Sequence, residues 1–260
     1  MPAYDFRTTR LFVDAPLHDA ARVTLDRSQA HYLTGVMRLR SGDGVLVFNG
    51  RDGEWLATLT PEKRTAGLQI VERTRPQTSA GDLHYLFAPL KSARLDYMVQ
   101  KAVEMGAARL QPVLTRHGQV ARVNSARMRA NAIEAAEQCG ILSLPEIAEP
   151  LALAHILSGF EPGGVEPRRF LIFCDEDADL ADPLEALGLI PRGAPLAVLI
   201  GPEGGFATDE RAALVRLPNV VRLALGPRIL RADTAAVAAL ALVQTVLGDW
   251  TTGAEATDAG

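Results

Sequence analysis

Two short glycine–proline turns, each directly after an apolar run, constrain this sequence most. The first is Leu199-Ile200-Gly201-Pro202-Glu203-Gly204-Gly205-Phe206, and the second is Leu225-Gly226-Pro227-Arg228-Ile229-Leu230-Arg231. The runs in front of them, residues 196–200 and 220–225, are typical of strands buried in a parallel sheet. Strands of this kind need helices to cover them, so the sequence predicts an α/β fold with a mostly parallel sheet and helices on both faces.

Each turn leads into a predicted helix. Thr208 with Asp209 and Glu210 begins one, and Asp233 begins the other ahead of residues 235–247. Glycine lets backbone N–H groups approach a ligand closely, and the carboxyl ends of neighbouring parallel strands are the usual place of a ligand site in such a sheet. We therefore expect the two turns to form one site. Two ordinary strand-to-helix turns are the alternative, which the similarity of the turns weakens.

The first part of the chain follows a different pattern. Short alternating runs with glycine turns between them predict a small β-barrel over residues 1–74, with strands at 10–13, 22–25, 44–48, 54–59 and 68–71. One helix over residues 28–39, capped by Ser28, interrupts the strands. A polar linker over residues 74–82 separates this barrel from the α/β domain over residues 75–260.

The α/β domain is expected to alternate strands with helices after the linker. Strands are predicted at 83–88, 109–114, 170–174, 196–200 and 220–225. Helices are predicted at 92–105, from a cap at Asn124 to Cys139, at 151–157, at 209–217, and at the end of the chain.

Composition excludes several classes of protein. The 260 residues hold no apolar run long enough to span a bilayer and no leader at Met1, so we expect a cytoplasmic protein with no membrane partner. The motifs of nicotinamide, P-loop, zinc-protease and α/β-hydrolase sites are missing. Cys139 and Cys174 are expected to be buried free thiols, and the five scattered histidines suggest no metal site.

Charge is unevenly distributed along the chain. The net charge is −4, yet residues 91–129 hold eight Lys and Arg against Asp96 and Glu104, and residues 175–185 are acidic. Arg38 and Arg40 flank the end of the first predicted helix. This segregation is consistent with a basic face for phosphates, and a merely solvated helix face is equally compatible with it.

The two turns resemble the signature loops of the SPOUT class, the trefoil-knot RNA methyltransferases. Residues 199–206 (LIGPEGGF) and 225–236 (LGPRILRADTAA) are most similar to the RsmE-type methyltransferases of small-subunit ribosomal RNA, which act on uridine N3. Supporting segments are residues 31–40 with Gly42-Asp43, residues 100–106, and residues 134–140 leading to 145–147. Departures from the family pattern occur at Ile141, at residues 115–118, and at Ala232-Asp233.

The resemblance implies a PUA-like RNA-binding barrel over residues 1–74 and a SPOUT-like methyltransferase domain over residues 75–260 with a C-terminal knot. It implies S-adenosylmethionine as cofactor, 16S ribosomal RNA or the small ribosomal subunit as partner, a homodimer formed through the knot region, and no metal. The cofactor is expected against Leu199, Gly201, Pro202, Gly204, Leu225, Gly226, Ile229 and Leu230. RNA is expected to contact Arg10, Arg38, Arg40, Lys91, Arg94 and Lys101.

Methylation of uridine N3 requires removal of the N3 proton, so a cation near the uracil oxygens and a nearby carboxylate are expected. Arg231 is the candidate cation, with an ion pair to Asp233 as its alternative role. Glu203 or Asp233 is the candidate base, and the sequence does not decide between them; Glu203 is alternatively an acceptor within its own loop. A SPOUT enzyme acting on a ribose 2′-OH or a transfer-RNA base, and a non-catalytic RNA-binding assembly factor, remain open.

Overall fold

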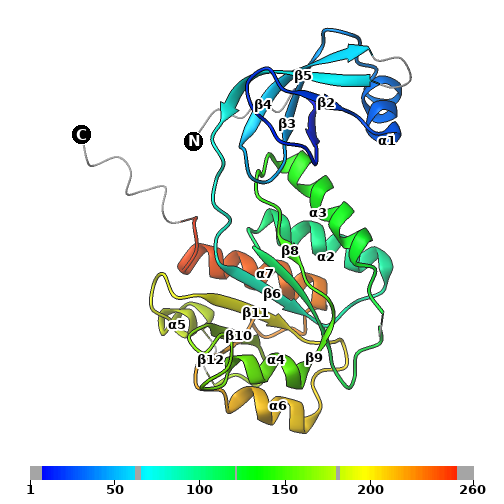
Figure 1. Cartoon of the computed structure of the whole chain (residues 1–260). Coiled ribbons are helices and arrows are strands. Elements are labelled where there is room, and N and C mark those ends of the chain that lie inside the picture. Colours follow the sequence, from blue (N-terminus) through cyan, green and yellow to red (C-terminus); the bar gives the residue numbers. More distant parts are fainter. Residues whose placement is uncertain (1–7, 62–65, 121, 180–181, 251–260) are drawn as a thin grey trace, which may run out of the picture. The chain divides into compact units, whose positions relative to one another are not determined.

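A computed structural model describes residues 8–61, 66–120, 122–179 and 182–250, and the chain divides into two compact units (Figure 1). Unit 1 comprises residues 1–79 and 133–144, and unit 2 comprises residues 80–132 and 145–260. The division differs from the predicted boundary at residue 74. Helix α3 (Ser125–Cys139) begins in unit 2 and ends in unit 1, because its last residues and the following loop cluster with the first unit.

Unit 1 is built on a five-stranded curled sheet. Its strands are β1 (Arg10–Phe12), β2 (Arg22–Thr24), β3 (Gly44–Phe48), β4 (Glu54–Pro61) and β5 (Ala66–Arg75), in the order β1-β3-β4-β5-β2. Only the β1–β3 pair is parallel among these strand pairs. Alternating side chains such as Val45, Val47 and Ala57 fill its core. The barrel-like sheet expected from the turn spacing is confirmed.

The helical segment of unit 1 is shorter than predicted. Helix α1 (Arg27–His31) is capped by Asp26, not by Ser28, because the Asp26 carboxylate accepts from the Gln29 N–H at 2.8 Å while the Gln29 side chain accepts from the Asp26 N–H. A single π-helical turn, η1 (Tyr32–Val36), follows. Arg38 has a φ of 57° and cannot continue a helix, so the predicted end at Leu39 is wrong.

Unit 2 contains a parallel sheet. Its strands are β6 (Leu83–Phe87), β7 (Arg109–Leu114), β8 (Glu146–Ile147), β9 (Leu151–Ala152), β10 (Phe170–Cys174), β11 (Leu196–Ile200) and β12 (Val220–Leu223). The order is β12-β10-β11-β6-β7-β8, with β9 paired to β7. Strand β10 therefore lies between β11 and β12, which corrects the expectation that the two glycine–proline turns follow neighbouring strands.

Helices cover both faces of this sheet. Helices α2 (Ser92–Glu104) and α7 (Ala232–Val246) pack together on one face, and α4 (Leu153–Phe160) and α6 (Thr208–Val215) pack on the other (Figure 1). Helix α5 (Pro183–Gly188), which the sequence analysis missed, is capped by Asp182. The helix expected at 151–157 begins at Leu153, because residues 151–152 pair with β7.

The cysteines differ from one another in exposure. Cys139 is exposed on α3, which corrects the expectation that both thiols are buried, and Cys174 lies at the end of β10 within the sheet. Burial raises the pKa of the Cys174 thiol to about 12, so this group stays protonated and unreactive.

Within the described residues, no helix has the length and apolar character needed to cross a membrane, and no group of side chains could hold a metal ion.

Candidate functional site

Two loops leave the carboxyl edge of the parallel sheet in unit 2. We call residues 201–207, after β11, the first loop, and residues 224–231, after β12, the second loop. All strands of this sheet run in one direction, so both loops emerge at the same edge, separated by the width of β10. The structure therefore brings the two sequence motifs to one side of the sheet, where α/β proteins bind their ligands.

Neighbouring elements hold the first loop in place. The His117 ring nitrogen Nδ1 lies 3.3 Å from the carbonyl oxygen of Gly204 and 3.2 Å from that of Gly205. The Phe206 ring meets the Phe173 ring edge-on, with centroids 5.3 Å apart. This packing joins the loop to the buried face of β10, so its backbone is fixed from two sides.

The start of α6 is anchored as well. The Glu210 carboxylate accepts hydrogen bonds from the Ala207 N–H at 3.0 Å and from the Arg116 N–H at 2.9 Å. The Arg116 guanidinium binds Asp209 through two hydrogen bonds of 2.8 and 2.6 Å. Residues after β7 and residues after β11 thus form one connected structure at the carboxyl edge.

The glycines of the loops leave backbone accessible. A Cβ atom on Gly201 would lie 2.6 Å from the Phe206 ring, so no side chain fits there without moving that ring. Gly205 and Gly226 have φ values of 70° and 87°, a conformation that favours glycine. The hydroxyl oxygen of Thr115, at the end of β7, is buried and has no partner among the described residues. Open backbone and a buried unsatisfied hydroxyl fit a bound cofactor with polar edges.

The second loop is far more exposed than the first. Residues 226–229 are all exposed, and the Ile229 side chain is 98% accessible to solvent. We find no hydrogen bond that ties residues 224–230 to the rest of the described chain. Arg231, the candidate cation, is exposed immediately before α7.

Arg94 on α2 connects the first loop to the start of α7, which directly follows the second loop. Its Nε and Nη2 atoms donate to the two carboxylate oxygens of Asp233 at 2.9 and 3.1 Å, and its Nη1 atom contacts the Glu203 carboxylate. The predicted alternative, an ion pair between Arg231 and Asp233, is replaced by this Arg94 pair. The structure thus brings the two candidate bases together on a residue that we had expected to bind RNA.

The arrangement changes the electrostatics of both partners. Hydrogen bonds from Arg94 hold the pKa of the Asp233 carboxyl below its usual range, and the carboxylates raise the pKa of Arg94. Asp233 is therefore ionised at neutral pH. It is also a weak proton acceptor, because protonation would break the hydrogen bonds that its charged form accepts.

The candidate RNA contacts differ in availability. Arg38, Arg40 and Lys91 are exposed. Lys101 binds the Glu104 carboxylate at 2.7 Å. Arg10 departs from the prediction, because its side chain is only 4% exposed and donates to Glu54 at 2.7 Å inside unit 1.

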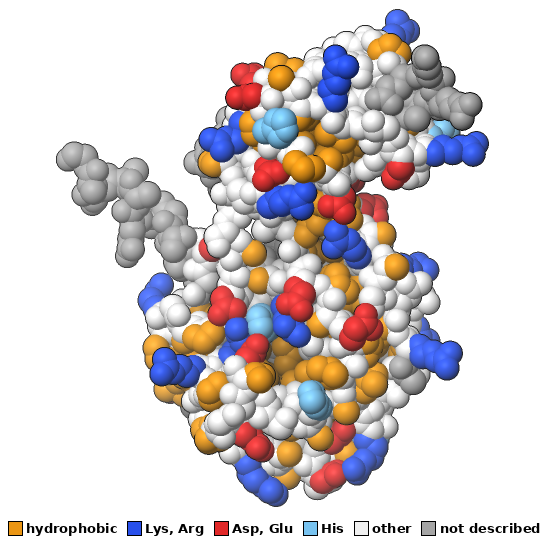
Figure 2. Space-filling model, in the orientation of Figure 1, with side chains coloured by type: hydrophobic (Ala, Val, Ile, Leu, Met, Phe, Trp, Pro, Cys, Tyr) orange, Lys and Arg blue, Asp and Glu red, His pale blue; other side chains and the backbone are white. Residues whose placement is uncertain are grey.

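Much of the predicted basic stretch is neutralised within unit 2. Besides Arg94 and Lys101, three further cations pair with carboxylates: Arg109 with Glu146, Arg116 with Asp209, and Arg127 with Asp96. The acidic stretch is also used internally, because Arg211 and Arg222 both bind the buried carboxylate of Asp175 at the end of β10. On the face shown in Figure 2, Lys and Arg side chains lie among Asp and Glu side chains. The charge segregation of the sequence therefore overstates the charge that this unit presents to an RNA.

Comparisons with protein families identify both parts of the chain. Residues 77–244 match an RNA methyltransferase domain family, and residues 25–70 match a PUA domain of RNA methyltransferases. The PUA match lies in unit 1 and includes α1, η1, β3 and β4. The methyltransferase match includes both loops.

Curated and solved relatives extend over most of the chain. Two relatives are named ribosomal RNA small subunit methyltransferase E. The protein from Synechocystis is 31% identical, over 87% of this chain and 74% of its own length. The protein from Rickettsia conorii is 27% identical, over 90% of this chain and 94% of its own length. A crystal structure of the enzyme of that name from Neisseria gonorrhoeae, bound to S-adenosylmethionine, is 26% identical, covers 94% of this chain and 100% of its own, and superposes with a TM-score of 0.82.

Proposed function

This chain belongs to the RNA methyltransferase family, and we propose that it methylates N3 of a uridine in the RNA of the small ribosomal subunit. It is a methyltransferase that uses S-adenosylmethionine, as its relative from Neisseria gonorrhoeae does. The observation that carries the proposal is the meeting of both signature loops at one sheet edge, joined by Arg94. The choice of uridine N3 rests on the likeness of the loop sequences to the RsmE type.

We propose that the backbone of the two loops holds the cofactor, which supplies an electrophilic methyl group when bound. Leu199, Gly201, Pro202 and Gly204 contribute from β11 and the first loop, and Leu225, Gly226, Ile229 and Leu230 contribute from the second loop. Leu199 is buried, so its part is limited to the backbone. The fixed first loop forms one wall, and the exposed second loop forms the other.

Arg231 is proposed to face the uracil oxygens, where its positive charge stabilises the anion formed when the N3 proton leaves. Between the two carboxylates, Glu203 is the better proton acceptor. Asp233 accepts two hydrogen bonds from Arg94 and one from the Thr234 N–H, whereas Glu203 contacts a single guanidinium nitrogen. Asp233 then serves to position Arg94.

RNA binding is proposed to involve the exposed Arg38 and Arg40 of unit 1 and Lys91 of unit 2. Arg38→Ala should weaken RNA binding by about threefold to tenfold and reduce the slope of log affinity against log salt by about one. Filter binding at several salt concentrations measures both. An unchanged slope would argue against a phosphate contact at Arg38.

A homodimer formed through a C-terminal knot is part of the same proposal. The exposed second loop supports it, since Ile229 is a large apolar side chain with no cover in the described chain. Sedimentation equilibrium of the full chain tests the dimer, and a monomer at micromolar concentration would contradict it.

The decisive experiment is methyl transfer from labelled S-adenosylmethionine to small ribosomal subunits isolated without base methylation, followed by mass mapping of the modified nucleotide. One N3-methyluridine is the expected product. A methyl group found on a ribose or on another base would still show a methyltransferase, but one with a different target. Absence of transfer together with absence of cofactor binding by calorimetry would favour a non-catalytic RNA-binding role.

A further inference from the structure

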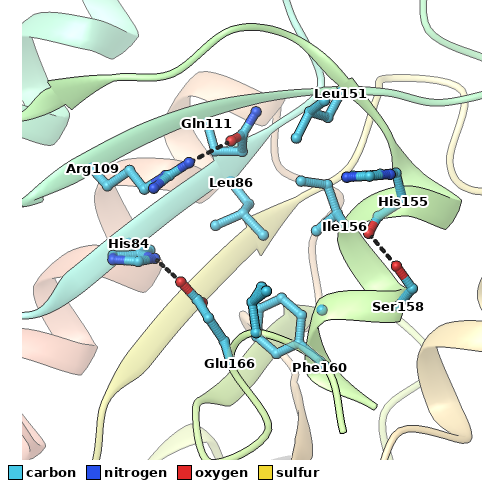
Figure 3. A pocket seen from close by; sticks show the side chains of 13 residues that line it. His84, Leu86, Arg109, Gln111, Leu151, His155, Ile156, Ser158, Phe160 and Glu166 are labelled. Carbon is cyan, nitrogen blue, oxygen red and sulfur yellow. Dashed lines mark hydrogen bonds and ion pairs between the residues drawn. The ribbon is translucent and has the colours of Figure 1, made fainter.

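A pocket lies in unit 2, between α4 and strands β6 and β7 (Figure 3). Its volume is about 290 Å³. Leu86, Ile156 and Phe160 provide apolar surface, while His84 and Arg109 lie on one side and His155 on the other. The scattered histidines suggest no metal site in the sequence, and their spacing does not predict this pocket.

This pocket is distinct from the cofactor loops. His84 and Arg109 are paired in register at the start of β6 and β7, at the amino edge of the sheet. The two loops leave from the opposite, carboxyl edge, after Ile200 and Leu223. No described residue that lines the pocket belongs to either loop, so a ligand here would be held by a separate set of side chains.

The charges around the pocket are balanced by carboxylates. Arg109 Nη1 lies 3.1 Å from Glu146, and Glu166 binds Arg169 at 2.7 Å. The two nitrogens of the His84 ring lie 3.5 Å from Asp82 and 3.6 Å from Glu166. Burial lowers the pKa of His84, so its ring is neutral at neutral pH. The pocket therefore lacks the excess positive charge that a free phosphate or carboxylate group would need.

The remaining features suit a flat, neutral and polar-edged ring. A guanidinium group and a neutral imidazole offer planar surfaces for stacking together with hydrogen-bond donors and an acceptor. Apolar side chains cover the rest of the surface. The volume is at the lower end of the range for ligand pockets, which suits one ring system more than an extended molecule.

We propose that this pocket binds a nucleobase, held between the Arg109 and His84 side and His155. The base comes either from an unpaired residue of the RNA substrate, which rests on the proposed function, or from a free nucleotide. Both sources present the same chemistry to the pocket. The experiment below separates them.

Binding is tested first without any reaction. The full chain, labelled at its histidine rings, is titrated with AMP, with UMP and with ribose 5-phosphate, which has no base. The ring signals of His84 and His155 are expected to shift with a nucleotide and to stay in place with ribose 5-phosphate. Equal shifts with all three compounds, or no shift with either nucleotide, would overturn the proposal.

Variants then assign the contacts. His155→Ala and Arg109→Ala should each weaken nucleotide binding by at least about fivefold, the range of a lost base-stacking contact. His155→Phe, which keeps a stacking ring at this exposed position, should stay within about twofold of the wild type. Arg216→Ala, which removes a cation from the exposed end of α6, is the matched control. Equal binding by His155→Ala and His155→Phe would contradict the stacking arrangement.

Methyl transfer identifies the source of the base. If the base belongs to the RNA, His155→Ala raises the KM for RNA and leaves kcat unchanged. If the ligand is a free nucleotide, His155→Ala loses nucleotide binding and keeps both constants. A wild-type protein that binds nucleotides but transfers no methyl group would refute the proposed function and leave the pocket intact.

Discussion

The two glycine–proline loops are similar in sequence and very different in their surroundings. The first is fixed by His117, by the packing of Phe206 on Phe173, and by the hydrogen bonds of Glu210. The second is exposed from Gly226 to Ile229, and its nearest side-chain anchor among the described residues is Asp233, at the start of the following helix α7, which binds Arg94. Similar motifs have thus become one preformed wall and one open wall of the same site.

The difference shows that a single chain fixes the first loop by itself and leaves the second loop without such contacts among the described residues. A loop held by its own protein needs no ordering when a ligand arrives, so binding to it costs little conformational entropy. A loop with a fully exposed isoleucine gains its contacts from something else, either the cofactor or a second copy of the chain. Variants in the two loops should therefore act on different measurements.

Gly201→Val is expected to have the largest effect. Its side chain would collide with the Phe206 ring and displace the backbone of the first loop, so affinity for S-adenosylmethionine should fall at least about a hundredfold. Isothermal titration calorimetry measures this. Gly188→Val, at a position where an added Cβ meets nothing, is the control and should bind normally. Retained affinity in a folded Gly201→Val protein would remove the first loop from the cofactor site.

Arg94→Ala removes the link between the first loop and the start of α7 while leaving the sequence of both loops unchanged. We expect kcat/KM to fall by about tenfold to a hundredfold, because the positions of Glu203 and Asp233 are no longer fixed relative to each other. Arg127→Ala, which breaks a pair with Asp96 on the same helix α2, is the matched control. If both variants lose activity equally, the effect belongs to helix α2 and not to the connection between the loops.

The anchor of the second loop should depend on pH. Arg94 holds the pKa of Asp233 below its unfolded value, so this carboxylate stabilises the fold above about pH 4 and ceases to do so as the pH falls through the lower, folded pKa. Denaturant unfolding should show Asp233→Asn about 1–2 kcal/mol less stable than wild type at pH 7. The two should converge once the pH has fallen below the folded pKa of Asp233. A constant difference would assign the loss to packing.

Ile229→Ser should change the stability of a single chain least, by under about 0.5 kcal/mol, because the side chain contacts solvent. Phe206→Ser, at the corresponding apolar residue of the first loop, should cost about 2 kcal/mol. Unfolding at low protein concentration measures both. A large loss for Ile229→Ser would show that the second loop is packed, and the contrast between the loops would disappear.

The sequence predicted the central strands of unit 2 better than it predicted the short helices α1 and α5. Strands β10 and β11 have the predicted bounds, because each is an uninterrupted apolar run between polar turns. Helix α1 was placed with the wrong cap, since Asp26 and Ser28 are both good caps and only the Gln29 side chain decides between them. Helix α5 was hidden in an acidic stretch whose Asp182-Pro183 start is its one local signal.

Side-chain partners were the least predictable part of the site. Arg94 looked like a phosphate contact because its two carboxylates lie more than a hundred positions away in the sequence. Arg10 was expected to contact RNA because its buried partner, Glu54, lies on another strand and cannot be identified from the sequence. The same limit hid the pocket at the amino edge of the sheet, whose lining comes from four separate segments. Local sequence patterns predict the positions of strands and helices, whereas the pairing of side chains from distant segments depends on the topology of the fold.

The order of strands in unit 2 has a consequence for synthesis and folding. Strand β6 is paired along its length with β11, Leu83 with Leu196 and Phe87 with Ile200, although most of the domain's sequence lies between them. During translation β6 and β7 can pair early, but the other edge of β6 stays open until β11 has left the ribosome. Contacts between such distant segments slow folding, and an open apolar edge invites association with other chains. Strand β11, which leads into the first loop, is thus also the strand that joins β6 and β7 to the rest of the sheet.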